Sequence, residues 1–127
     1  MPDPPNNHGV AARWFVMMRD AIVVHPEPLT AMQISGVLER AGYAATIARS
    51  AREALLARVR PELAIVAVHL PDDAGPRLAR RLAAAVPGLR IVFVDRLTRA
   101  EAVAAGMPAD ASFVEGPAIE QDLRSMV

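Results

Sequence analysis

The sequence predicts an α/β fold, in which helices cover both faces of a doubly wound parallel sheet with strand order 2-1-3-4-5. Short apolar runs rich in β-branched residues alternate with amphipathic stretches of helical period along the chain. One run, from Leu63 to Val68, is apolar throughout, as expected for a strand that is covered on both faces. The connections are short and no internal repeat is visible, so the 127 residues are expected to hold one domain with right-handed crossovers.

Five apolar runs mark the strands of this sheet. In chain order they cover residues 21–24, 44–48, 63–68, 91–94 and 112–114. Each run is flanked by proline, glycine or polar residues, which is typical of strands that end in short loops. Because a helical stretch follows each run, neighbouring strands are expected to lie parallel.

Periodicity and capping residues place a helix after each strand. We expect helices over residues 29–41, from Ser50 to before Pro61, from Gly75 to Pro87, from Thr98 to about residue 105, and from Pro117 onward. Gly42 lies where a C-terminal cap of the first helix belongs. Ser50 with Glu53, and Thr98 with Glu101, have the spacing of a capping box, in which the hydroxyl and the carboxylate each accept a backbone N–H.

Composition narrows the possible function classes. The chain contains 14 basic and 14 acidic residues, so its formal net charge is zero and it is not expected to bind nucleic acid or an anionic membrane. It has no cysteine, which excludes disulfides and thiolate chemistry, and every basic residue is arginine, which excludes lysine chemistry. The longest apolar run is far shorter than the ~20 residues of a transmembrane helix. With no apolar stretch typical of a signal peptide, a cytoplasmic location is expected.

Residues 1–19 are expected to form a flexible N-terminal extension ahead of a domain over residues 20–127. The first nine residues carry three prolines and a glycine. Further along, Trp14, Phe15, Met17 and Met18 form an apolar cluster. Three roles remain open for this cluster: it docks on the surface of the domain itself, it extends the first strand, or it contacts a partner, since aromatic residues and methionine are enriched at interfaces.

Two segments, residues 23–28 and 63–75, carry a family resemblance. They resemble the first and third strands, with their following loops, of the receiver (CheY-like) domain of two-component response regulators. Leu70, Pro71 and Gly75 match the framework that follows the phosphorylated aspartate of that family, and the position of the aspartate itself falls on Ala67. The resemblance extends from about Ala21 to the C-terminus and implies a flavodoxin-like (βα)5 fold.

Compared with the family pattern, every side chain needed for phosphotransfer is replaced. The acidic pair that holds magnesium in the family falls on His25 and Pro26. The hydroxyl residue after the fourth strand falls on Asp95, where a carboxylate would repel a phosphoryl group. The lysine after the fifth strand falls on Glu115 or Gly116, and Glu115 would reverse its charge. The resemblance therefore implies a degenerate pseudo-receiver that lacks the phosphoacceptor.

This resemblance implies a signalling module and not an enzyme. We expect phosphorylation-independent protein–protein interaction or dimerisation within a two-component or phosphorelay system, with no cofactor. The partner is expected to be a protein or a second copy of the chain. In the family, pairing commonly uses the face of the fourth helix, fifth strand and fifth helix. Transferred to this chain, that face includes Thr98, Val103, Phe113, Ile119 and Leu123.

Two alternative functions remain open from the residues. His25, His69 and Asp95 end neighbouring strands, and two imidazoles with a carboxylate are a plausible ligand set for zinc or iron. The vacant end of the sheet would then be a metal or small-ligand sensor. Alternatively, Asp72 or Asp73 could serve as a displaced phosphoacceptor, although an acidic pair between a proline and a glycine is also ordinary turn chemistry.

Overall fold

The structure, a computed structural model, describes residues 18–127. Trp14, Phe15 and Met17, and with them nearly all of the expected N-terminal extension, lie outside the described residues. Within the described part, the first strand begins at Arg19, two residues earlier than the apolar pattern predicted. No helix in this part of the chain is long and apolar enough to cross a membrane.

Five parallel strands form one sheet in the predicted order β2-β1-β3-β4-β5. Their bounds are β1 (Arg19–Val24), β2 (Tyr43–Ala48), β3 (Leu63–Ala67), β4 (Arg90–Asp95) and β5 (Ser112–Glu115). The fold class is therefore confirmed as flavodoxin-like. In such a sheet the carboxyl ends of all strands lie at one edge, which is where sites form in this architecture.

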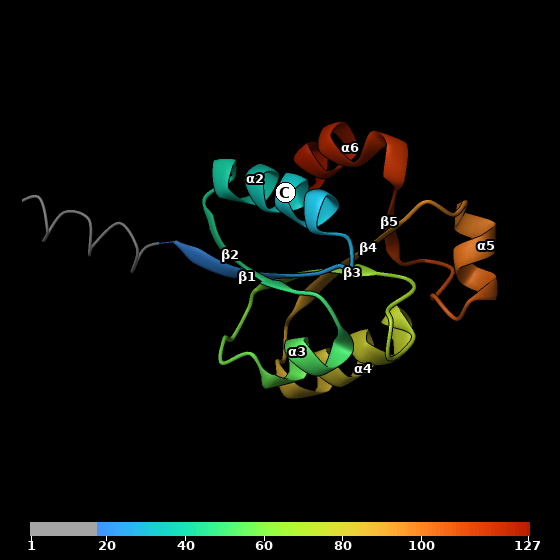
Figure 1. Cartoon of the computed structure of the whole chain (residues 1–127), viewed down its shortest axis with the longest axis horizontal. Coiled ribbons are helices and arrows are strands. Elements are labelled where there is room, and N and C mark those ends of the chain that lie inside the picture. The colour runs from blue at the N-terminus through green and yellow to red at the C-terminus, as the bar shows by residue number, and fades with distance from the viewer. Residues whose placement is uncertain (1–17) are drawn as a thin grey trace, which may run out of the picture.

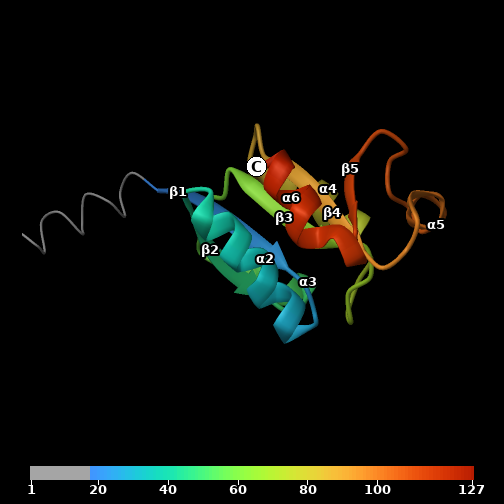
Figure 2. The same cartoon turned by 90° about the horizontal axis from the view of Figure 1, so that it is seen from above.

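Helices cover both faces of the sheet (Figure 1). On one face lie α2 (Pro28–Arg40) and α6 (Ile119–Met126), and on the other lie α3 (Ala51–Leu56) and α4 (Gly75–Ala85). A short 3-10 turn, η1 (Gly116–Ala118), leads into α6. The remaining helix, α5 (Arg99–Ala104), lies apart from α3 and α4 in both views (Figures 1 and 2).

The strand β3 shows how the sheet separates two apolar cores. All five of its residues are buried. Leu63 and Ile65 pack into the core beneath α2 and α6, whereas Ala64 and Val66 pack into the core beneath α3 and α4. This alternation is the period of two of an extended strand, and it explains why the sequence of a doubly covered strand is apolar at every position.

The helix caps largely follow the sequence signals. Gly42 adopts a φ of 93° after α2, and the Thr98–Glu101 capping box forms in full before α5. The prediction for Ser50 was half right. Its hydroxyl accepts the Glu53 N–H, but the Glu53 carboxylate accepts the N–H of Arg49 (3.1 Å) instead of that of Ser50. This helix, α3, also ends early, at Leu56, because the next residue is already extended.

Gly75 joins α4 closely to the end of β3. Its N–H donates to the carbonyl of Val68 at 2.8 Å. A Cβ atom at this position would overlap the carbonyl oxygen of Ala67. Only glycine therefore fits here, and its small size lets the helix begin directly beside the carboxyl end of the central strand.

Candidate functional site

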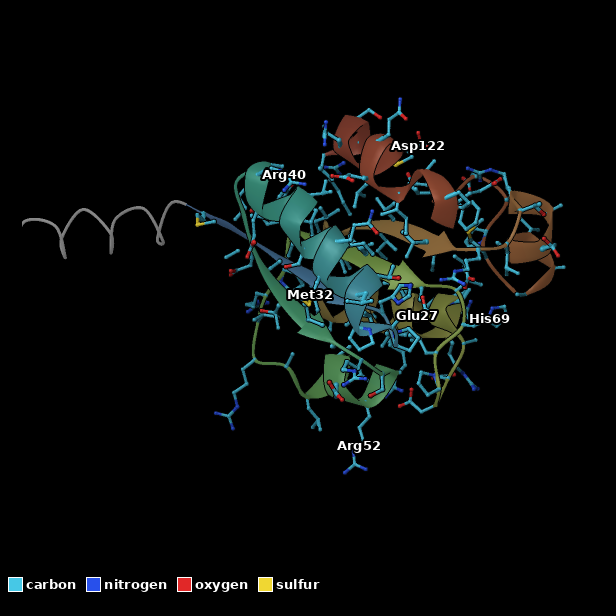
Figure 3. The ribbon with its side chains drawn as sticks, turned by 45° about the horizontal axis from the view of Figure 1, so that its top comes forward. Glu27, Met32, Arg40, Arg52, His69 and Asp122 are labelled. Atoms are coloured by element: carbon cyan, nitrogen blue, oxygen red, sulfur yellow. The ribbon has the colours of Figure 1, made fainter. Side chains whose placement is uncertain are left out.

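A hollow of about 300 Å³ opens at the carboxyl ends of β1, β3 and β4, and we call it the mouth. Glu27 and His69 lie at this end of the molecule (Figure 3). Several predicted positions meet here, including His25, Pro26, Ala67 and Asp95. The lining is completed by Glu27, Thr30, Gln33, His69, Arg96, Gly116 and Ile119.

The floor of the mouth is apolar at its centre. Ala67 is the last residue of β3 and is 2% exposed. Its methyl group presents no acceptor or nucleophile to the hollow. Among residues 18–127, two carboxylates line the mouth: Glu27, from the turn after β1, and Asp95, from the end of β4.

His25 closes the turn between β1 and α2. Its N–H donates to the carbonyl of Ala48 at 3.0 Å, and its Nδ1 accepts the N–H of Glu27 at 3.1 Å. Burial lowers the pKa of His25 below its ordinary value of 6.5, opposed by the charges of Glu27 and Asp95 and assisted by that of Arg96. A neutral imidazole with an unprotonated Nδ1 is what this hydrogen bond requires.

Asp95 joins two loops of the mouth through its carboxylate. Its Oδ2 atom accepts the backbone N–H of His69 at 3.2 Å and lies 3.5 Å from the Nδ1 of the same residue. Its Oδ1 atom accepts the N–H of Arg96 at 2.7 Å. The side chain is largely buried, at 19% exposure. Both oxygens are thus engaged by the backbone that follows β3 and β4.

Arg96 supplies the cation of the mouth. Its Nη2 atom lies 3.4 Å from Oε1 of Glu27, which joins the end of β4 to the start of α2. Gly116 makes room for this side chain, because a Cβ there would come within 3.0 Å of Cγ of Arg96. The signal in the sequence that could have found this cation is the arginine directly after Asp95.

Of the two positions that the sequence left open after β5, Glu115 or Gly116, the structure places only Gly116 at the mouth, so no charge is reversed there. Glu115 pairs with Asp95 in the strand register, yet its side chain is exposed and does not line the mouth. Gly116 lines the mouth in its place. The reason is the register of β5, which ends at Glu115 and turns into η1 at the next residue.

The proposed metal ligands converge only in part. His69 and Asp95 are in contact, and His25 lines the same hollow. Among residues 18–127, however, no three histidine or carboxylate side chains are grouped so that they could hold a metal ion. The Nδ1 of His25 is also engaged by a backbone N–H.

Asp72 and Asp73 lie outside the mouth, in a separate hollow beside α3. The two carboxylate oxygens of Asp72 accept the N–H groups of Ala51 and Arg52, each at 2.9 Å. These bonds, that of Arg52 first, lower the pKa of Asp72. Asp73 accepts the N–H of Ala74 at 2.8 Å and lies 3.7 Å from Arg77. Asp72 thus accepts N–H groups at the N-terminus of α3, and Asp73 accepts one at the N-terminus of α4.

Three of the five predicted interface residues belong to the cores. Phe113, Ile119 and Leu123 are 8%, 4% and 0% exposed. The prediction that these three residues contact a partner is therefore wrong: Phe113 of β5 packs into the core beneath α3 and α4, and the apolar stripe of α6 faces the sheet. Thr98 is on the surface as the cap of α5, and Val103 is 37% exposed.

The comparisons with known proteins agree with this geometry. No protein-family model matches the sequence, and no curated protein matches it. Solved structures do match. The beryllofluoride-activated receiver domain of DrrB has a TM-score of 0.77 and 22% identity, over 87% of this chain and 94% of that one. The chain has the fold of a receiver domain.

Other receiver folds give similar values. A CheY-like receiver protein from Methanospirillum hungatei has a TM-score of 0.74 and 23% identity, over 86% of this chain and 90% of that one. The receiver domain of a histidine kinase from Syntrophus aciditrophicus has a TM-score of 0.69 and 28% identity, over 85% and 86%. The chain spans half the length of the Thermotoga maritima response regulator DrrB (TM-score 0.75, 22% identity, 86% of this chain).

Proposed function

We propose that this chain is a pseudo-receiver that works without phosphorylation, as a protein–protein interaction or dimerisation module of a two-component system. The observation that carries the proposal is Ala67 at the centre of the mouth. A phosphoryl group needs an acceptor atom and cations that neutralise its oxygens. At the end of β3 the chain offers a methyl group in place of a carboxylate.

The rest of the mouth supports the same proposal. The backbone N–H groups of His69 and Arg96, in the loops after β3 and β4, already donate to Asp95. The guanidinium of Arg96 already faces Glu27. A magnesium ion prefers several oxygen ligands, whereas the turn after β1 begins with a buried imidazole and a proline. A phosphoryl group would meet donors that are already in use.

The decisive experiment is an amide-correlation NMR titration of the whole chain with magnesium and beryllofluoride. We expect no saturable shifts at His25, Ala67 or Asp95. The DrrB receiver domain, which has been solved in a beryllofluoride-activated form, is the positive control under the same conditions. Saturable shifts at the three positions would show that the mouth still takes a phosphoryl group, and the proposal would be wrong.

The interaction role is tested separately, by sedimentation of surface variants. Val103 is the apolar residue that remains exposed on the face of α5, β5 and α6. On α2, Leu29 and Met32 lie three residues apart and are 82% and 65% exposed, so this face of α2 is the other candidate contact site. If the α5 face pairs two copies, Val103→Glu converts the dimer to a monomer and the Leu29→Glu, Met32→Glu double variant does not. The reverse result would move the contact to α2.

A further inference from the structure

The two edge strands of the sheet differ in how well they are protected. β5 is four residues long and carries the charge of Glu115. β2, at the other edge, is six residues long and contains no charged residue, no glycine and no proline. Natural sheets protect their edges with short strands, charges or proline, because an open edge pairs with other chains. The edge of β2 lacks these protections and is suited to take up a further strand.

The backbone of β2 directs alternate residues to the open edge. The carbonyl of Ala48 accepts the N–H of His25 at 3.0 Å, so the even-numbered residues of β2 turn their backbone groups toward β1. By the same period of two, the N–H and C=O groups of Ala45 and Ile47 point away from β1. Within residues 18–127, β2 pairs with β1 alone, so these groups have no neighbouring strand.

Exposed apolar side chains gather around the same edge. Helices α2 and α3 pack against β2 from opposite faces of the sheet (Figure 1). In the described part of the chain six large apolar side chains are exposed, and five of them belong to these three elements: Leu29, Met32, Ile47, Leu55 and Leu56. A contact along this edge would therefore remove apolar surface from water.

The strand β2 is complementary to a second copy of itself. Ala45 packs toward the core beneath α2, so Ile47 lies on that face and Thr46 lies on the α3 face. Antiparallel pairing must match like faces, and a register with Thr46 opposite Thr46 does so. It places Ile47 of each copy opposite the small Ala45 of the other, as a hydrogen-bonded pair. A twofold axis repeats every one of these contacts.

Charges at the two ends of β2 fit the same arrangement. Glu39 lies in the last turn of α2, just before the amino end of β2, and Arg49 directly follows the carboxyl end. Both side chains are exposed, and neither forms an ion pair within residues 18–127. In an antiparallel pair the carboxyl end of one strand meets the amino end of the other. Arg49 of each copy therefore lies at the end that carries Glu39 of the other.

We propose that two copies of this chain pair through β2, antiparallel about a twofold axis, so that their two sheets become one. This inference rests on the proposed function, because it names the surface through which the module dimerises. It does not involve the mouth, so the two can fail separately: the beryllofluoride titration tests the mouth, and the experiments below test the edge.

Amide hydrogen exchange of the unmodified chain tests the pairing directly. When the concentration is raised until sedimentation shows a dimer, the amides of Ala45 and Ile47 should exchange several-fold more slowly. Those of Ala44 and Thr46, which face β1, should be protected at every concentration. A dimer in which Ala45 and Ile47 exchange as fast as in the monomer would overturn the proposal. Protection of both amides in a monomer would also overturn it, since residues of the same chain would then cover the edge.

A lysine at the edge tests the surface. Ile47→Lys should give a monomer at concentrations where the unmodified chain is a dimer. Val103→Lys is the matched control and should remain a dimer, since the two β-branched side chains are 39% and 37% exposed. The reverse result would place the contact on α5, and a chain that is monomeric at every concentration would contradict the pairing. If Ile47→Lys fails to fold, Ala45→Pro replaces it, because proline removes an outward N–H and leaves the bonds to β1.

Discussion

The Oδ2 atom of Asp95 accepts the backbone N–H of His69 at 3.2 Å, so a side chain at the end of β4 holds the loop that follows β3. The second oxygen accepts the N–H of Arg96. A mostly buried carboxylate with two backbone donors is a structural connection between neighbouring strands. Removing this carboxylate is therefore expected to lower the stability of the fold.

Asp95→Ala should lower the free energy of unfolding by about 1–3 kcal/mol, because the N–H groups of His69 and Arg96 lose their acceptor. Urea denaturation of both chains measures the difference. Asp110→Ala, which removes an exposed carboxylate from a loop, is the control and should change stability by less than about 0.5 kcal/mol. An unchanged midpoint for Asp95→Ala would mean that these hydrogen bonds contribute nothing.

Ala67→Asp should not restore phosphorylation by acetyl phosphate and magnesium, since Pro26 offers no metal ligand. It should destabilise the protein by on the order of 3 kcal/mol, because the new carboxylate is buried close to Asp95. Intact mass spectrometry measures the first effect and denaturation the second. Ala67→Asn is the control, because it adds a side chain of the same size without a charge. The difference in the free energy of unfolding between the two variants is then the cost of the charge. A full phosphoryl adduct on Ala67→Asp would show that the acidic turn has been placed wrongly.

His25 should make stability depend on pH. Burial lowers the pKa of His25 in the folded protein below its ordinary value of 6.5. At a pH between the lowered pKa and 6.5, the unfolded chain binds a proton that the folded chain does not. Stability is therefore complete above about pH 7 and falls as the pH drops through 6.5. Thermal melts from about pH 8 to 5 measure this slope. His25→Asn should flatten it, whereas His69→Gln, at an exposed position, should not.

Gly75→Ala should cost more than about 2 kcal/mol, because the added methyl group collides with the carbonyl of Ala67 and forces α4 away from β3. Gly36→Ala is the matched control within α2. A Cβ there meets only the end of the Arg40 side chain at 3.6 Å, so helix propensity should dominate. We expect this control to be neutral or to stabilise by up to about 1 kcal/mol. Equal losses for both variants would contradict the steric argument.

The fold was predictable because its strands are short, apolar and separated by helical stretches. Leu63–Ala67 is the clearest case, since burial on both faces leaves an uninterrupted apolar run. The resemblance to receiver domains also placed Ala67 at the end of β3, because its motif runs from Gly75 and Pro71 back through one loop to one strand end. Local patterns of this kind depend on residues that are close in the sequence.

The rest of the site could not be predicted, because spacing along the sequence does not show which way a side chain points. Whether Glu115 or Gly116 faces the mouth depends on where β5 ends, and one residue reverses the answer. Asp95 looked like a repelling charge, but its oxygens face backbone donors from another loop. Ile119 and Leu123 were taken for a contact surface, although their spacing of four is equally the stripe by which a helix packs on its sheet.

The carboxylate of Asp95 is part of the chain, so it cannot dissociate from the mouth or be hydrolysed away. An anion that binds from solution can leave by dissociation, and a covalently attached one by hydrolysis. The link that Asp95 makes between the loops after β3 and β4 is present from the moment the domain folds and lasts as long as the fold itself. Its occupancy is independent of metabolite concentration. Under the proposed function, any change over time in the behaviour of this protein comes from the concentration of the chain or from what binds to its surface.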